Sequence, residues 1–231
     1  MTVPIPVNVK CAVCGKISEQ FVLSSTIYLG SSDLDTRPPE LARSSMELWL
    51  QVCPHCGYVA PNISKHIRGA KKVVKSEQYQ KLVSTLDLSN YERERPRLEV
   101  KFLCYSLIQE NAKNYVEAGW AQVKAAWACD DQGADELAKD HRLKAVEFFN
   151  KAKEMGYKFA EDRVTEHIVL TDLLRRAGKF ESALGTLRDG LSMHPDGLAV
   201  KILKFEKALI EQEDTAAHTV EEAKNTALDL N

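Results

Sequence analysis

The sequence predicts a mainly α-helical protein with a small β-rich module at its N-terminal end. Two observations point to this class. The chain up to about residue 60 holds four of the six cysteines and five of the eight prolines, together with short β-prone segments. The remainder is rich in Ala, Leu, Lys and Glu, and its apolar residues recur with the period of an α-helix. We therefore expect a module of residues 1–64 followed by a helical part of residues 65–231.

Length and charge restrict the class of protein further. The chain of 231 residues carries a formal net charge of −2, so no overall field draws it to nucleic acid or to an anionic membrane. No apolar run approaches the length of about 20 residues that spans a bilayer. The opening MTVPIPVNVK lacks the basic start and the apolar stretch of a secretory signal. We expect a cytoplasmic protein that does not bind a membrane.

Two β-prone segments occur in the N-terminal module. QFVLSSTIYL (20–29) predicts a hairpin strand with one buried face, and MELWLQV (46–52) is a second β-prone segment. Between them, SSDLDTRPPELARSSM is polar, and we expect Thr36 to cap a short helix that begins at Pro38 and Pro39. We expect this segment to form an ordered loop over the cysteines.

The four N-terminal cysteines form two Cys-x-x-Cys-Gly units, at Cys11 and Cys14 and at Cys53 and Cys56. The glycine after each pair can adopt the left-handed conformation that closes a tight turn and directs backbone N–H groups at the sulfurs. Two such turns supply four thiolates, which is the donor set of a tetrahedral structural zinc site. The spacing predicts a zinc-ribbon-like site of four cysteines with one Zn²⁺ per chain. Because four protein ligands leave no open coordination position, we do not expect catalysis at the metal.

Two redox chemistries use the same residues. Paired Cys-x-x-Cys-Gly turns also hold the single iron of rubredoxin-type electron carriers, so iron is an alternative to zinc. A thioredoxin-like dithiol needs one Cys-x-x-Cys pair at the start of a helix. Here there are two pairs, and Pro54 and Gly57 favour a metal-binding turn. An iron or dithiol redox protein is therefore an alternative function.

Helical periodicity extends from about Lys71 onward. Pro96, three glycines and an HPDG turn mark the boundaries between successive helices. The expected helices comprise residues 73–89, 97–112, 114–132, 135–155, 158–177, 179–193, 197–212 and 215–228.

The helical part contains a repeat. VTEHIVLTDLLRRAGKFESALGTLRDGLSMHP follows the tetratricopeptide pattern, a helical pair of about 34 residues. In its second helix Ala183 and Gly190 permit close approach of the two helices, and Leu187 fills the groove between them. The preceding segment AVEFFNKA places three residues at the same offsets, namely Ala145, Phe149 and Ala152. We expect a tetratricopeptide-like helical-repeat solenoid.

Two groups of polar residues are candidate binding sites. In the loop between the cysteine pairs, Asp33, Asp35, Arg37 and Glu40 form a possible ligand-binding loop for a cation, a carboxylate or a phosphate, although turn formation and helix capping explain the same residues. KHIRGAKKVVK contains five basic residues and no acidic one, which predicts either phosphate contacts or an ordinary solvated face. These residues are Lys65, Arg68, Lys71, Lys72 and Lys75.

The sequence contains no motif of a common enzyme class. A glycine-rich phosphate loop, a Gly-x-Ser-x-Gly elbow and a His-Glu-x-x-His helix are all missing. Cys104 and Cys129 lie in apolar helical segments and are expected to be small buried residues rather than nucleophiles. We do not expect an enzyme.

The chain resembles a bacterial family known as domain of unknown function 2225. The resemblance rests on CAVCG, SSDLDTRPPELARSSM and WLQVCPHCGYVA, and it extends less specifically through AAWACDDQG. It implies a bacterial source, a metal site at the four paired cysteines and tetratricopeptide-like helices after them, and it implies no activity. The first pair reads Cys-Ala-Val-Cys in place of Cys-Pro-x-Cys, which loosens that turn without removing a ligand.

These features predict a non-catalytic, metal-stabilised adaptor whose helical groove binds a protein or peptide. A nucleic-acid-binding zinc-ribbon protein is the alternative from another class. It would use the basic residues 65–75, without interleaved aromatic residues to stack on bases, and its affinity would fall steeply with salt.

Overall fold

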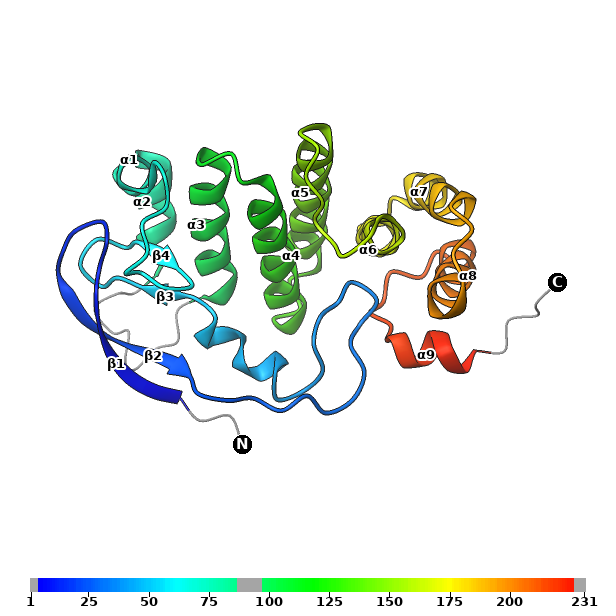
Figure 1. The fold of residues 1–231 in the computed structure, drawn as a ribbon, viewed down its shortest axis with the longest axis horizontal. Helices are drawn as coiled ribbons and strands as arrows, with labels where there is room; N and C mark the ends of the chain where they lie inside the picture. Colours follow the sequence, from blue (N-terminus) through cyan, green and yellow to red (C-terminus); the bar gives the residue numbers. More distant parts are fainter. Residues whose placement is uncertain (1–3, 87–96, 227–231) are drawn as a thin grey trace.

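The computed structural model describes residues 4–86 and 97–226. The protein is mainly helical with a small N-terminal β region, as predicted. Figure 1 shows the helices in one row and the N-terminal segment (blue) along an edge of that row. The strands are β1 (Pro4–Lys10), β2 (Ile17–Leu23), β3 (Gln51–Val52) and β4 (Val59–Ala60), and a 3-10 helix, η1, comprises Arg43–Leu48. The helices are α1 (Ala70–Val74), α2 (Glu77–Val83), α3 (Leu98–Asn111), α4 (Tyr115–Asp131), α5 (Asp135–Glu154), α6 (Arg163–Arg176), α7 (Phe180–Ser192), α8 (Gly197–Glu211) and α9 (Val220–Asn225).

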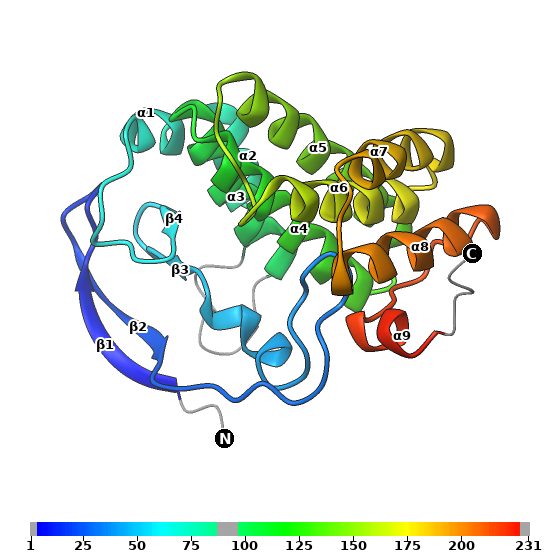
Figure 2. The same ribbon diagram turned by 45° about the vertical axis from the view of Figure 1, so that its right-hand side comes forward.

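Each helix from α3 to α8 packs on the next one along the chain (Figures 1 and 2). Helices α4 and α5 come close together because Gly119 has no side chain: a Cβ atom there would lie 2.5 Å from the ring of Phe149. Phe149 instead stacks on Phe159 at 4.1 Å and meets Trp120 edge-on at 5.2 Å, both measured between ring centroids. The periodicity of the sequence located α3, α4, α5, α7 and α8 to within a residue at each end.

Three expected helices have different bounds because local capping intervenes. The helix expected at 73–89 is divided, since the hydroxyl of Ser76 accepts from the backbone N–H of Tyr79 and starts α2; residues 87–89 lie outside the described residues. Helix α6 starts at Arg163 rather than at 158, because Asp162 caps it. The last helix starts at Val220 rather than at 215, where Thr219 forms a capping box with Glu222. Its expected end, residues 227–228, also lies outside the described part.

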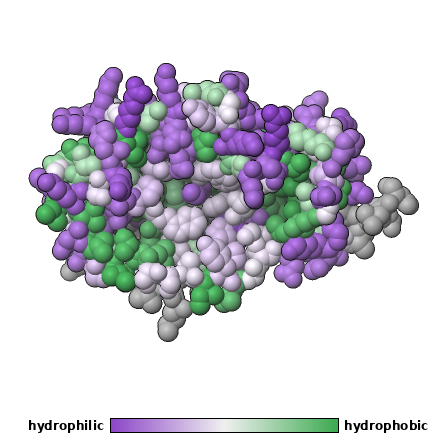
Figure 3. Space-filling view, viewed as in Figure 1, coloured by the Kyte–Doolittle hydropathy of each residue, from purple (hydrophilic) through white to green (hydrophobic). Residues whose placement is uncertain are grey.

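The β region consists of two hairpins. β1 pairs with β2 from Pro4 opposite Leu23 to Lys10 opposite Ile17, and β3 pairs with β4. The strand expected at 20–29 is confirmed as far as residue 23, whereas β1 was not predicted. Most of the segment 46–52 is not a strand, because η1 extends to Leu48 and β3 has two residues. Figure 3 shows hydrophobic residues (green) over the first hairpin, where Ile17 is 64% exposed.

The loop between the hairpins follows an unexpected course. It runs along the ends of the helices toward α6 and α9 (Figures 1 and 2) rather than over the cysteines. The backbone N–H of Leu34 donates to the carbonyl of His218 at 2.9 Å, and that of Val220 donates to Ser32 at 2.9 Å. Thr36 has φ +72° and is not the cap of a helix. The expected position of this loop was therefore wrong, since residues near the C-terminal end hold it.

One hydrophobic core crosses the expected boundary at residue 64. It contains Cys53 and Tyr58 of the second hairpin together with Tyr79 of α2 and Phe102 of α3. A second core joins α6, α7 and α8. The division into residues 1–64 and 65–231 stays a prediction. In the described part of the chain, none of the helices has the length and apolar character needed to cross a membrane.

A buried arginine between two acids connects α6 to α8. Arg175 donates to Asp172 at 2.5 Å and to Glu206 at 2.8 Å, and these three side chains are almost wholly buried. Among the described residues, Asp172 Oδ2 and Glu206 Oε1 have no hydrogen-bond partner. Burial, followed by the negative charge of Asp172, raises the pKa of Glu206 well above 4.5. Burial beside a second carboxylate therefore favours the protonated form of Glu206.

We expect Glu206→Gln to flatten the pH dependence of stability. Because the folded-state pKa of Glu206 is raised, its contribution is fully present below pH 4.5 and is lost as pH rises toward that folded-state pKa. Glutamine is an uncharged counterpart of the protonated acid, so wild type should lose stability relative to the variant as pH rises. Urea unfolding at pH values between about 5 and about 7 measures this. A variant with the same pH slope as wild type would contradict the raised pKa of Glu206.

Candidate metal centre

The four paired cysteines come together at one point. The sulfur of Cys11 lies 3.8 Å from that of Cys56, and the sulfur of Cys14 lies 3.6 Å from that of Cys53. All four sulfurs lie within 4.8 Å of one another, and none is in a disulfide. A tetrahedral metal with metal–sulfur bonds of about 2.3 Å places its sulfurs about 3.8 Å apart. The cluster therefore fits a single metal ion with four thiolate ligands.

Each cysteine pair forms the loop of a hairpin, and the two loops have the same hydrogen bonds. Cys11 donates its backbone N–H to Lys16 and accepts at its carbonyl from Gly15, both at 2.9 Å. Cys53 donates to Tyr58 at 2.9 Å and accepts from Gly57 at 2.8 Å. The first pair joins β1 to β2, and the second joins β3 to β4. Local turn chemistry thus shapes both halves of the site before they meet.

The site is closed on one side and open on the other. Cys11 and Cys53 are buried, whereas Cys14 is exposed. A hydrogen bond from the Cys56 thiol, followed by backbone N–H groups of the same turn, lowers the pKa of Cys53 to about 5. Burial raises the pKa of Cys11, and the hydrogen bond to Cys53 raises that of Cys56. One thiolate therefore forms readily, and the positive charge of a metal ion favours release of the remaining protons.

Side chains that the sequence did not single out attach the site to the helices. The hydroxyl of Tyr79 in α2 donates to the backbone carbonyl of Gly57 at 2.8 Å. The hydroxyl of Tyr58 donates to the backbone carbonyl of Lys65, also at 2.8 Å. Ala12 donates its backbone N–H to Ile63 at 2.8 Å, which joins the first loop to the chain after the second. Burial raises the pKa of Tyr58 to about 12. The apolar surroundings of the two tyrosines in the sequence indicate that they are buried. The sequence does not indicate their hydrogen-bond partners, because these lie 7 and 22 positions away along the chain.

We expect Gly57→Ala to destabilise the site more than Gly15→Ala. Both glycines have positive φ, +74° and +77°, which costs alanine about 1 kcal/mol. A Cβ at Gly57 would also lie 2.6 Å from a methyl of Val83, whereas one at Gly15 meets nothing within 4 Å. Overpacking adds about 1–3 kcal/mol at Gly57 alone. Urea unfolding at a fixed metal concentration measures the difference, and equal losses would contradict the close packing of α2.

The residues of the possible ligand-binding loop lie apart from the cysteines and pair within the chain. Asp35 is fully buried and accepts from Trp127 at 2.7 Å and from Arg176 at 3.1 Å. Arg37 pairs with Asp131, and Asp33 accepts from Arg43 through both carboxylate oxygens at 2.9 Å. Glu40 is exposed and accepts from Ser44. The four side chains do not surround one open site.

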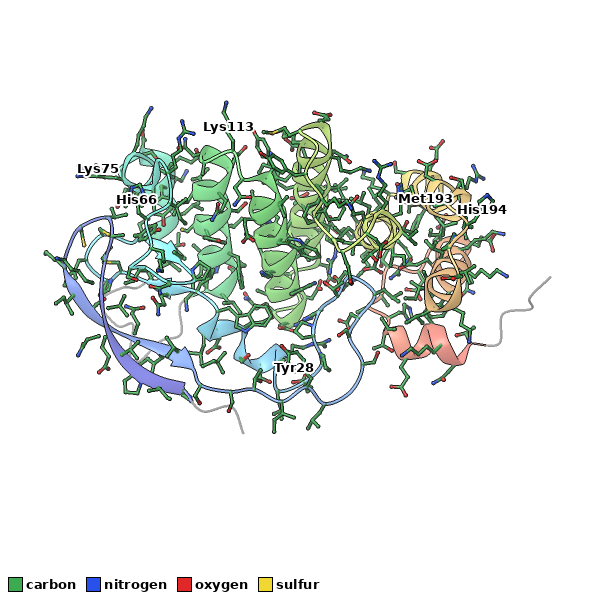
Figure 4. All side chains as sticks on the ribbon, viewed as in Figure 1. Tyr28, His66, Lys75, Lys113, Met193 and His194 are labelled. Carbon is green, nitrogen blue, oxygen red and sulfur yellow. The ribbon has the colours of Figure 1, made fainter. Side chains whose placement is uncertain are left out.

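The five basic residues are exposed on and beside α1. Figure 4 shows Lys75 and the neighbouring His66 at the end of the row of helices that lies near the β hairpins. The side chains diverge: Lys71 and Lys75 line a pocket at the second cysteine loop, whereas Lys72 lines another pocket against α3. Cys104 and Cys129 are buried, as expected of small core residues, and neither belongs to the group of four neighbouring sulfurs.

The fold and the cluster define a mainly helical protein with four cysteines able to hold a metal ion at the loops of two hairpins. Residues 7–223 match the family model described as "Uncharacterized protein conserved in bacteria (DUF2225)". The chain belongs to this family, which confirms the resemblance seen in its motifs. Comparison with curated proteins and with solved structures gave no match.

Proposed function

We propose that the protein is a non-catalytic interaction scaffold whose N-terminal hairpins are held together by one structural zinc ion. The observation that carries this proposal is the closed set of four thiols at tetrahedral spacing. Four thiolates saturate a zinc ion, so the metal has no position for a substrate or an activated water. Its contribution is to folding, because it joins two hairpins too short to be stable alone.

The helices support the interaction part of the proposal. In α7, Ala183, Leu187 and Gly190 are buried at the positions expected of a tetratricopeptide-like pair. A Cβ at Gly190 would lie 3.0 Å from the Cβ of His167 in α6, so the absence of a side chain sets the approach of the helices. We take α3 to α8 as a tetratricopeptide-like solenoid, an architecture that presents extended surfaces to protein partners. The reduced cysteine set suits the reducing cytoplasm.

Elemental analysis of the purified, untagged protein, together with its visible absorption spectrum, tests this function. We expect about one zinc per chain and no colour. Iron with strong visible absorption bands would instead assign the protein as an electron carrier, because the same four thiolates can hold a single redox-active iron. A metal-free protein with a reversible disulfide would support the dithiol alternative and overturn the proposal.

A further inference from the structure

A pocket lies between the second cysteine loop and helices α1 and α2. Its volume is about 680 Å³, and its walls come from both sides of the metal site. Val74 and Val83 contribute buried apolar side chains, and Val13 and Pro54 contribute more exposed ones. A peptide can therefore place an aliphatic side chain against this surface.

The pocket carries positive charge at its rim. Lys71 and Lys75 lie four positions apart, so they share one side of the chain, and both are exposed. In the described part of the chain, neither lysine has an ion pair, and the pocket is lined by no aspartate or glutamate. Figure 4 shows Lys75 directed away from the body of the molecule. Exposed cations beside an apolar surface are complementary to a carboxylate that adjoins an aliphatic side chain.

Nucleic acid fits this surface less well. A phosphate backbone needs a track of cations, whereas Lys72 leaves the pocket and lines a different one beside Glu110 of α3. Among the described residues, no phenylalanine, tyrosine or tryptophan lines the pocket to stack on a base. The metal site adjoins the pocket through Cys14 and Cys56.

We infer that this pocket binds an acidic peptide segment of a protein partner, in which one or more carboxylates adjoin an aliphatic residue. The inference rests on the proposed scaffold function and places the partner's contact at the metal-bearing end. Lys71 and Lys75 would pair with the carboxylates, and Val13 and Pro54 would contact the aliphatic side chain. The metal acts only by holding the second loop opposite α1.

Selection from a library of short random peptides on the zinc-loaded protein tests the inference. Enriched peptides should share Asp or Glu next to Leu, Ile, Val or Met. A synthetic, fluorescein-labelled copy of an enriched peptide should lose about tenfold in affinity, by fluorescence polarisation, on Lys71→Glu or Lys75→Glu. Lys72→Glu is the matched control on the same helix and should change the affinity by less than about twofold.

Several outcomes would overturn the inference. One is that no peptide is enriched, and another is that the enriched peptides lack acidic residues. A third is that Lys72→Glu lowers the affinity as much as Lys71→Glu does, because the peptide would then respond only to the overall positive charge. Tighter binding of a labelled oligothymidylate that the same peptide displaces would assign the surface to nucleic acid. Zinc content is measured on every variant: loss of zinc on Lys71→Glu or Lys75→Glu would give these lysines a role in the metal centre instead. Normal zinc without peptide binding rejects this pocket alone, whereas absence of zinc from wild type rejects the proposed function.

Discussion

Replacing Cys53 by serine is expected to remove the metal and unfold the two N-terminal hairpins while most of the helical signal remains. Cys53 is fully buried at the start of the second loop, and a serine hydroxyl does not replace a thiolate ligand. Metal binding to such sites contributes on the order of 10 kcal/mol to folding, which hairpins of this size cannot supply from their own contacts. The largest loss of order should lie in residues 4–60.

Helices α7 and α8 should persist because their core is separate from the one that contains Cys53. The core of α6, α7 and α8 contains no residue of the two cysteine loops. Helices α1 to α3 share the core that contains Cys53, and α2 also meets the second loop directly, since Tyr79 donates to the carbonyl of Gly57. We therefore expect hydrogen exchange to quicken in α1 to α3 as well as in the hairpins.

Three measurements check this prediction. Elemental analysis should show loss of metal, far-ultraviolet circular dichroism should show a retained helical signal, and hydrogen exchange should locate the disordered segment. Cys129→Ala is the matched control, because Cys129 is buried in a helix away from the cluster and its loss should leave the metal content unchanged. A Cys53→Ser protein that keeps its full metal content would remove Cys53 from the site.

Replacing Asp35 by alanine is expected to cost about 3–5 kcal/mol of stability, as the loss of one member of a buried ion pair does. Arg176, which is 6% exposed, would keep one carboxylate partner in Asp130 and lose the other. Trp127 would lose the acceptor of its ring N–H. The carboxylate therefore fastens the loop to α4 and α6 at once.

A graded series separates charge from packing at this position. Asp35→Asn retains an acceptor for Trp127 but removes the charge that Arg176 faces, so its loss should be intermediate. Glu40→Ala, in the same loop, removes an exposed carboxylate and should change the free energy of unfolding by less than about 0.5 kcal/mol. Urea unfolding compares the three variants. Equal stability of Asp35→Ala and Glu40→Ala would show that the loop is not held by this ion pair.

The conformation of the two cysteine loops could be predicted from the sequence, whereas that of the segment joining them could not. The loops were predictable, because each one is closed by hydrogen bonds between residues at most five positions apart, such as Cys11 to Lys16. The spacing and the glycines record that geometry directly. The joining segment was assigned a helix cap at Thr36, yet the contacts that shape it come from residues such as Trp127 and His218. Local preference was overridden because these distant contacts bury a charge.

The short strands also could not be predicted from local sequence patterns. β3 and β4 have two residues each, too few for an alternating pattern, and β1 contains Pro4 and Pro6, which lower its strand propensity. Their pairing depends on the loops that connect them rather than on their own residues. The longer helices were recovered well, since α4 and α5 repeat the apolar period over several turns.

By itself, the sequence determined the donor set of four cysteines, the turns that present two sulfurs each, and the helical character of the chain after residue 70, because these properties arise between near neighbours. Only the tertiary structure decided that the two turns meet with their sulfurs within 4.8 Å, that α2 braces the second turn, and that the polar loop is buried against α4 and α6. These outcomes depend on which distant surfaces exclude water from one another. A buried carboxylate such as Asp35 is stable only where a cation and a ring N–H are in place to meet it, and the folded arrangement of helices supplies both.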